Sequence, residues 1–423
     1  MKKAASLLVL VVMLITVSGL ASAQTELSFW YHGAGNTAEG EVFQMIVDDF
    51  NASQSDYVVV VEDFPQANYN SSIVAAAAAG DMPDIVDIDG PVFANWAWSG
   101  WLAPLSLSEG ATEGLLPSAI SEYQGDLYAV GLWEAAVAVF ARRSVLDAND
   151  IRIPTLDEPW TADEFDAALE ALQATGEFDV ALDLGMVWTG EWYPYAFSPF
   201  LQSFGGDMID RDTYLTAEGA LNGPEAVAFG EWWQSLFERG LAYGTSQDGA
   251  DRDTCFIDNR CALQWNGNWA GAAAAEAAGD DILFLPAPDF GHGNIIGAAS
   301  WQLGLSATSE HPEGVNAFIE FALQDEYFVA FSDGNGLAPP TKDAAGLTMN
   351  YSSGAAMEVF YELSEAQGLV RPVTPGYPTM ALIFEKALAD IANGADVQDT
   401  LDAAVDEIDQ DIEDNMGYGF EDM

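Results

Sequence analysis

The first residues in this chain that could do chemistry are its tryptophans, because several of its 13 Trp residues stand beside hydrogen-bonding side chains. These groups lie in segments punctuated by Gly and Pro, which are expected to be loops, at residues 30–32, 133–134, 191–195, 264–269 and 300–302. A flat aromatic ring covers the C–H face of a sugar, and donors and acceptors in the ring plane reach its hydroxyl groups. The pattern therefore favours a site for a sugar-like ligand.

Two of the polar groups fall at the ends of expected strands, where ligands of α/β sheets bind. Trp30 and His32 end the first strand, and Asp87 and Asp89 flank the end of another. One of the two aspartates is expected to cap the following helix, which would leave the other for ligand. His32 could donate to a ligand hydroxyl, although a local role in its loop is an equally good interpretation.

The elements that must position these residues alternate between strand and helix. After residue 23, an alternating strand is expected at 26–31 and a helix with apolar residues at helical spacing at 42–50. A valine-rich strand at 57–61, a helix at 69–79 that ends at Gly80, and a short strand at 83–88 follow. This β-α-β-α-β order predicts a parallel sheet covered by helices.

The alternation continues to the end of the chain without a fixed repeat or a long linker. Further strands are expected at 135–140, 262–265, 282–285 and 301–305, and further helices at 162–174, 224–239, 312–323, 355–367, 379–393 and 397–414. We therefore expect an α/β protein whose parts pack as one unit.

The composition excludes some partners. The 67 acidic and 12 basic residues give a formal net charge of −55, and half of the residues are hydrophobic. The apolar content is far too high for a disordered acidic chain, and the charge disfavours nucleic acids and anionic membrane surfaces. Adaptation to high salt, where the screening length is only about 3 Å, is the favoured explanation of the acidity, and an ordinary acidic exported protein is the alternative.

Residues 1–23 have the pattern of a secretory signal peptide. Lys2 and Lys3 precede an apolar run over residues 7–17, and Ala21 and Ala23 provide a small-x-small cleavage site. The alternative, a membrane anchor, is disfavoured because the run is shorter than the ~20 residues that a span needs. No cysteine lies near Ala23, so we expect a soluble exported protein without a lipid anchor.

Export would place Cys255 and Cys261 in an oxidising compartment. A turn signal, Asp258 and Asn259, lies between them, which favours a local disulfide across that turn. Two free buried thiols are the alternative. No metal site is expected, because none of the three histidines lies near this pair in the sequence.

Six segments, in order, carry a family resemblance. They are Gly80-Asp-Met-Pro-Asp-Ile-Val86, the Trp-rich stretch 96–105, residues 128–142 with Pro154, the paired glycines within 201–207, residues 258–269, and Pro375-Gly-Tyr-Pro378. Together they resemble the extracellular solute-binding proteins of sugar ABC transporters, the group that includes maltose-binding protein, over essentially the whole chain after residue 23. Arg260 replaces the usual Lys of that family, and Leu263 replaces the usual Met.

The resemblance implies the periplasmic-binding-protein type II fold: two α/β lobes joined by hinge crossings, with the ligand cleft between them. The first lobe would use residues 24–133 and 300–342, and the second residues 134–299 and 343–423, with crossings near Glu134 and Ala299. It further implies a periplasmic or extracellular monomer, without cofactor or metal, that closes on a carbohydrate and delivers it to the permease subunits of an ABC importer.

The resemblance also implies roles for single residues. It places a sugar-stacking ring at Trp269, a hydroxyl-accepting carboxylate at Glu134 and an aromatic loop at Tyr193 and Tyr195. Arg371 could bind an anionic sugar, but a structural ion pair is favoured. The full set of candidate ligand contacts is Trp30, His32, Asp87, Asp89, Glu134, Tyr193, Tyr195, Asn266, Trp269, Trp301, Arg371 and Tyr377.

Two other functions remain open. A secreted glycosidase would also use aromatic residues and carboxylates, although the chain has neither a Gly-x-Ser-x-Gly elbow nor a His-Glu-x-x-His motif. A sugar sensor that feeds a receptor would use the same fold. The identity of the ligand, including a glycosylated compatible solute in place of a sugar, also stays open.

Overall fold

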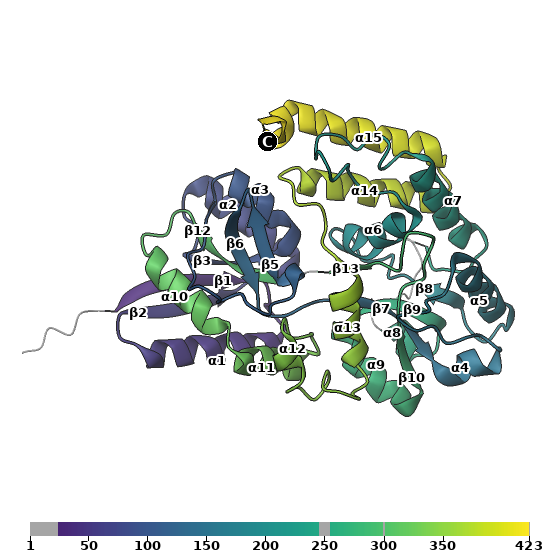
Figure 1. The fold of residues 1–423 in the computed structure, drawn as a ribbon, viewed down its shortest axis with the longest axis horizontal. Helices are drawn as coiled ribbons and strands as arrows, with labels where there is room; N and C mark the ends of the chain where they lie inside the picture. Colours follow the sequence, from purple (N-terminus) through teal and green to yellow (C-terminus); the bar gives the residue numbers. More distant parts are fainter. Residues whose placement is uncertain (1–23, 245–253, 299–300, 423) are drawn as a thin grey trace, which may run out of the picture.

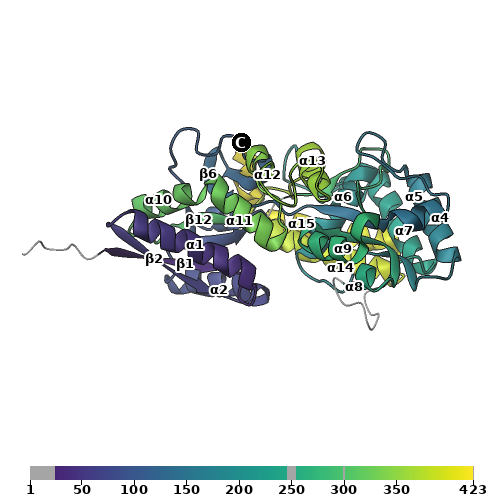
Figure 2. The same ribbon diagram turned by 90° about the horizontal axis from the view of Figure 1, so that it is seen from below.

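The computed structural model describes residues 24–244, 254–298 and 301–422, and it consists of two α/β lobes that each contain a separate sheet (Figure 1). Figure 2, turned by 90°, shows the same two lobes, with α1, α2 and α10 in the first and α4, α5 and α7 in the second. The predicted signal peptide lies outside the described residues. The α/β class and the two-sheet architecture are as expected.

The sheet of the first lobe begins with parallel strands and ends with antiparallel ones. Strands β1 and β2 pair in parallel, as do β1 and β3, which confirms the expected β-α-β-α-β unit. Strand β12 then joins β3 from much later in the chain, running antiparallel. The order is β2 (Tyr57–Asp63), β1 (Thr25–Tyr31), β3 (Ile85–Asp89), β12 (Trp301–Ser306), β6 (Asp126–Gly131) and β5 (Ile120–Tyr123), with β4 (Leu102–Ala103) on β12.

Helices cover both faces of this sheet. The apolar residues of α1 recur at helical spacing, and Asn36 caps its first turn. The helices of this lobe are α1 (Thr37–Ser53), α2 (Gln66–Ala79), α3 (Phe93–Trp98), α10 (Pro312–Ala322), α11 (Asp325–Asn335) and α12 (Lys342–Ala345), with the 3-10 turns η1 (Gly90–Val92) and η2 (Pro117–Ala119).

The second lobe surrounds a four-stranded sheet of order β10 (Ile282–Leu285), β7 (Val137–Arg142), β9 (Cys261–Gly267) and β8 (Val180–Asp183). Its helices are α4 (Arg143–Ala148), α5 (Ala162–Ala174), α6 (Trp192–Phe204), α7 (Pro224–Glu238), α8 (Thr254–Ile257), α9 (Gly271–Ala278), α13 (Glu358–Gln367), α14 (Tyr377–Ala392) and α15 (Val397–Asp414), with the 3-10 turns η3 (Asn268–Ala270) and η4 (Gly279–Asp281).

The chain passes between the lobes more than once. It runs from β6 in the first sheet to β7 in the second, and from β11 (Ile296–Gly297) to β12 in the first. Strand β11 pairs with β13 (Gly368–Leu369), which lies between the lobes in Figure 1. After α15, the turn η5 (Met416–Asp422) brings the end of the chain beside α3 of the first lobe.

Three clusters of buried apolar side chains hold this architecture together. The largest fills the second lobe, and the other two lie in the first lobe. Trp269 packs against the cores of both lobes. Fully burying one large apolar side chain contributes about 1.5–3 kcal/mol, so these clusters dominate the stability of each lobe. Among the described residues, none of the helices combines the length and the apolar character that a bilayer crossing requires.

The expected disulfide is wrong in this structure, because Cys255 and Cys261 are free and buried. The Cys255 thiol hydrogen-bonds to Asp183 and to Cys261, and the ligand atoms of all three residues lie within 4.8 Å of one another. Burial raises the pKa of the Cys261 thiol well above its ordinary value. Since the thiolate is the reactive species in disulfide exchange, the raised pKa lowers the reactivity of Cys261.

Candidate ligand-binding site

A cavity of about 390 Å³ lies where the two lobes meet, within the range of small-molecule sites in proteins. The first lobe contributes the turn after β3, the segment around η2 and β5, and Gln302 of β12. The opposite wall comes from Val370, Arg371 and Val373, which follow β13. The cavity therefore has walls from segments far apart in the sequence.

The wall beside β13 is organised by a buried ion pair. The Arg371 guanidinium, in a side chain that is 4% exposed, contacts the carboxylate of Glu191 at the start of α6, and the Tyr377 hydroxyl of α14 donates to the same carboxylate oxygen. The guanidinium carbon also lies 4.9 Å from the ring centre of Tyr195. Three segments of the second lobe are joined through the Glu191 carboxylate.

Electrostatic interactions extend this network to Asp89 at the end of β3 in the first lobe. Burial raises the pKa of Glu191 to about 7, and Arg371 offsets only part of that effect while Asp89 adds to it. Burial likewise raises the pKa of Asp89, against the influence of Arg371 and His32. The carboxyl groups of Glu191 and Asp89 and the guanidinium of Arg371 therefore influence one another electrostatically beside the cavity.

The raised pKa of Glu191 predicts a pH-dependent stability. Its value of about 7 in the folded protein lies above the ordinary 4.5, so the folded state binds this proton more tightly than the unfolded chain does. The contribution of Glu191 to stability should therefore fall as the pH rises from about 4.5 to about 7. Glu191→Gln, which keeps a hydrogen-bonding side chain, should remove this component.

Urea unfolding of wild type and of Glu191→Gln at several pH values across that window measures the difference. The wild-type free energy of unfolding should decline relative to that of the variant as the pH rises. Parallel pH profiles for the two proteins would contradict the assignment.

In the first lobe, His32 and Asp87 form a buried pair beneath Trp301. His32 Nδ1 lies 2.5 Å from Asp87 Oδ2, and its ring stacks on the Trp301 indole with centres 3.6 Å apart and planes 7° apart. Burial alone would lower the pKa of His32, but the charge of Asp87 and its hydrogen bond, helped by Glu39 and Asp89, outweigh burial and raise it. The imidazole thus supports one face of the indole, and Asp87 favours its protonated form.

The expectation that Asp87 or Asp89 caps the following helix is wrong. Asp87 is fully buried, and one of its oxygens forms a hydrogen bond with His32. The Asp89 side chain makes no capping hydrogen bond to η1. Trp30, another candidate at this sheet edge, lies 4.6 Å from the Phe64 ring, and its carbonyl oxygen accepts a hydrogen bond from Tyr69. Its ring therefore packs within the first lobe.

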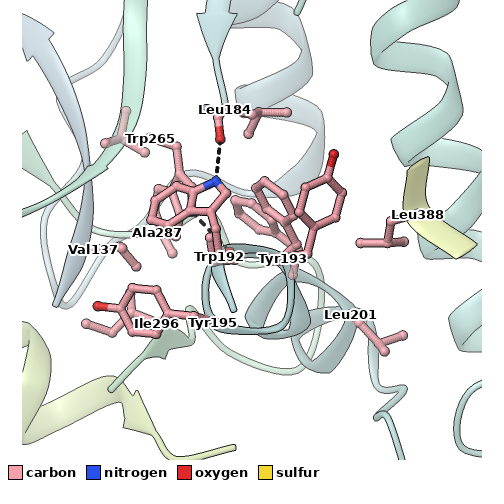
Figure 3. Packing of buried hydrophobic residues seen from close by; sticks show 14 of the residues in the cluster. Val137, Leu184, Trp192, Tyr193, Tyr195, Leu201, Trp265, Ala287, Ile296 and Leu388 are labelled. Atoms are coloured by element: carbon pink, nitrogen blue, oxygen red, sulfur yellow. Dashed lines mark hydrogen bonds between the residues drawn. The ribbon is translucent and has the colours of Figure 1, made fainter. Parts of the chain in front are cut away.

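Tyr193 and Tyr195 lie in helix α6, and not in the loop that the sequence suggested. Pro194 is compatible with this helix because it stands in the first turn, where its missing N–H has no helical partner. Figure 3 shows the two rings on different sides of the helix. The Tyr193 hydroxyl donates to the Met186 carbonyl inside the core, so only Tyr195, beneath Arg371, borders the charged network.

Trp269 is the centre of an aromatic cluster in the second lobe. Its ring centre lies 6.1 Å from Trp188, 6.0 Å from Trp192 and 6.2 Å from Tyr195. The indole lies over Gly267, where an added Cβ would come within 2.1 Å of the ring. A glycine at that position is therefore required for Trp269 to adopt this orientation.

Glu134 and Asn266 are more deeply placed than ligand contacts need to be. Glu134 is fully buried, accepts a hydrogen bond of 2.7 Å from the Ser118 hydroxyl, and bridges through its backbone to Ala338. Ser118 itself lines the cavity. Asn266, in β9, is also buried, and its side-chain oxygen accepts from the Gly267 amide.

Sequence reasoning missed several residues here. The candidate contacts did not include Glu191 of the ion pair or Gln302 of the cavity wall. They also did not include Trp188 and Trp192 of the aromatic cluster. Glu191 and Trp192 fall inside a segment that was recognised as polar and aromatic. Nothing local distinguishes an acid that meets an arginine 180 residues later from the many solvated ones.

Residues 45–359 match the family model of the bacterial extracellular solute-binding proteins, which is most of the chain. The chain belongs to this family. As a solute-binding protein it is a receptor and not an enzyme, so the binding interpretation is confirmed over the glycosidase alternative.

Curated relatives of this solute-binding protein are distant in sequence. It is 25% identical over 314 residues to an uncharacterized lipoprotein of Streptomyces antibioticus, covering 70% of this chain and 66% of that one. It is 24% identical over 338 residues to a mannitol-binding protein of Pseudomonas aeruginosa, covering 77% and 74%. The chain thus spans just under two thirds of the first relative.

Solved structures share the fold. The cyclic α-maltosyl-1,6-maltose binding protein of Arthrobacter globiformis superposes with a TM-score of 0.76 at 20% identity, over 92% of this chain and 100% of the other. The GacH receptor of Streptomyces glaucescens, determined unliganded and with acarbose, gives 0.74 at 21%, over 92% and 98%. The expected fold is confirmed.

Proposed function

We propose that this solute-binding protein captures a carbohydrate, a di- or oligosaccharide or a glycoside, and delivers it to an ABC importer. The observation that carries the proposal is the cavity between the lobes, which Arg371 lines. The Arg371 guanidinium lies over the ring of Tyr195, which is a member of the Trp269 cluster. A sugar-binding site requires aromatic rings that cover the C–H faces of the sugar and polar side chains that hydrogen-bond to its hydroxyl groups. Relatives of the same fold bind maltodextrin-type ligands, acarbose and mannitol by their names.

Within this proposal the site residues divide into two classes. Trp269, Trp301 and Arg371 are the direct contacts that we favour, because each is partly exposed or lines the cavity. The supporting class comprises residues that are at most 6% exposed and do not line the cavity: His32, Asp87, Glu134 and Tyr377.

The lobes are proposed to follow the sheets, with residues 24–133 and 300–342 in the first and 134–299 and 343–423 in the second. Sheet membership supports this division, because β12 pairs with β3 and β7 pairs with β9. Closure about the crossings near Glu134 and Ala299 would bring ligand groups together, and a ligand that bridges the lobes shifts the population toward the closed form. Ala299 itself lies outside the described residues.

Export is part of the same proposal. Cleavage after Ala23 would release a protein of the periplasm or the cell exterior, in keeping with a family named for its extracellular members. The permease of the importer is then the partner that reads the closed form, and the receptor is expected to act as a monomer.

A ligand screen tests the function. Mannitol, maltose, maltotriose, maltotetraose, glycosides and glycosylated compatible solutes are added singly to the purified protein, and the unfolding temperature is compared with that of the unliganded protein. A ligand at about 100 times its Kd should stabilise the fold by about 2.7 kcal/mol. Stabilisation without chemical change of the sugar supports a receptor, whereas no stabilisation by any carbohydrate, glycosides and compatible solutes included, would refute the proposed ligand class.

A further inference from the structure

The end of the chain crosses from the second lobe to the first. Residues 416–422, which form η5 and are called the C-terminal strap here, follow α15 directly. The Phe420 ring stacks on Tyr214 of the second lobe with centres 5.0 Å apart and planes 20° apart, and its centre lies 6.5 Å from Tyr123 of the first. Tyr418 meets the Trp98 ring of α3 at 5.1 Å. Two aromatic side chains of the strap thus touch both lobes.

The backbone of the strap is held in a conformation that needs such contacts. Four consecutive residues have a positive φ: Met416 (53°), Gly417 (63°), Tyr418 (52°) and Gly419 (83°). Consecutive left-handed residues are disfavoured unless they are glycine. The Tyr418 hydroxyl is anchored by a hydrogen bond of 2.7 Å to Asp411 of α15, so the strain is offset by specific partners.

The first-lobe partners of the strap belong to elements that build the cavity. Trp98 lies on α3, whose first residue Phe93 lines the cavity, and Tyr123 directly follows the lining residue Glu122. On the other side, an added Cβ on Gly376 would come within 2.9 Å of the Tyr418 ring, so the strap packs closely on the start of α14.

A second link runs the same way. The Asn95 side chain of α3 donates a hydrogen bond of 2.7 Å to the carbonyl of Pro375. Both links join α3 to the segment between the cavity-lining Val373 and helix α14. They therefore connect the two walls of the cavity in this conformation.

We propose that the C-terminal strap is a positioning element of the binding site, in which Tyr418 and Phe420 hold the first-lobe wall of the cavity against the second-lobe wall. This inference rests on the proposed function, because it takes the cavity as the ligand site. Tyr418 and Phe420 act through the walls and are not assigned a contact with ligand.

The test compares Phe420→Ala with the conservative Phe420→Tyr and with a chain that ends at Asn415. Maltotriose is the probe, and its dissociation rate is measured by stopped flow. Loss of the ring should speed dissociation by roughly tenfold, which is the typical effect of losing about 1.4 kcal/mol of contact, with a smaller change in association. Phe420→Tyr should restore the wild-type rate. Phe321→Ala removes a partly buried ring from the first lobe alone and should change stability without changing dissociation.

A second readout needs no sugar. Amide hydrogen exchange in the ligand-free protein should rise at residues 90–93 and 117–122 in Phe420→Ala and in the shortened chain, but not in Phe321→Ala. If wild type does not bind maltotriose, the choice of sugar is wrong, and exchange still decides on the strap. Unchanged exchange at these segments would overturn the proposal, and tighter binding by the shortened chain would also overturn it, because the strap would then hold the walls apart.

Discussion

Trp269→Ala is expected to weaken carbohydrate binding by roughly ten- to a hundredfold, or about 1.4–2.7 kcal/mol. The indole packs against the apolar cores of both lobes, and its ring centre lies 6.0–6.2 Å from those of three further aromatic residues of the second lobe. The indole would cover the C–H face of a bound sugar and so remove that face from water. Alanine removes both the platform and part of the contact between the lobes.

The measurement is titration calorimetry with the sugar that stabilises wild type most. Trp232→Ala serves as a matched control, because Trp232 is a partly buried tryptophan that packs on Phe290 and Phe204 within the second lobe and is not part of the Trp269 cluster. Both variants should retain the wild-type circular dichroism. A folded Trp269→Ala protein with wild-type affinity would remove Trp269 from the proposed site.

Arg371→Met is expected to lower the free energy of unfolding by about 3–5 kcal/mol near pH 8, which is typical when one partner of a buried ion pair is removed. The reason is that the Glu191 carboxylate, whose side chain is 28% exposed, would stay in its largely desolvated position beside Asp89 without its cation. The loss should be smaller near pH 5, because Glu191 already has a pKa of about 7 in the wild type and takes up a proton when the arginine is absent.

The double variant Arg371→Met with Glu191→Leu separates charge from packing. Replacing both partners by apolar side chains should recover much of the lost stability, as measured by urea unfolding. A loss that is equal at both pH values and is not recovered in the double variant would show that Arg371 contributes by packing alone.

The sequence predicted the elements well because their signals are local. The helices α5 and α15 begin and end where the apolar spacing places them, and the β-α-β-α-β unit appears with its expected parallel pairing. Periodicity and capping depend on residues within one or two turns, so they can be read without the fold. The paired glycines and the Trp-rich segments also sufficed to indicate the family.

The site was predictable only in part. Trp269 and Trp301 could be proposed as ligand contacts because aromatic residues in Gly- and Pro-rich segments are visible in the sequence. The ion pair favoured for Arg371 is present, but its partner Glu191 was not predicted. Tyr193 was expected beside the ligand, but it lies in the core. Residues two apart on a helix, such as Tyr193 and Tyr195, point to different sides. The difference between contact and support depends on burial, which one sequence does not contain.

By itself, the sequence determined the α/β class, the order of the elements and the residue types of the proposed ligand site. Only the tertiary structure decided which charged groups meet: Glu191 with Arg371 across 180 residues, and His32 with Asp87 beneath Trp301. It also decided that Cys255 and Cys261 remain thiols and that the end of the chain reaches α3. Local patterns are set by nearest neighbours along the chain, whereas ion pairs, pKa shifts and the spacing of two lobes depend on desolvation and contacts that exist only after folding.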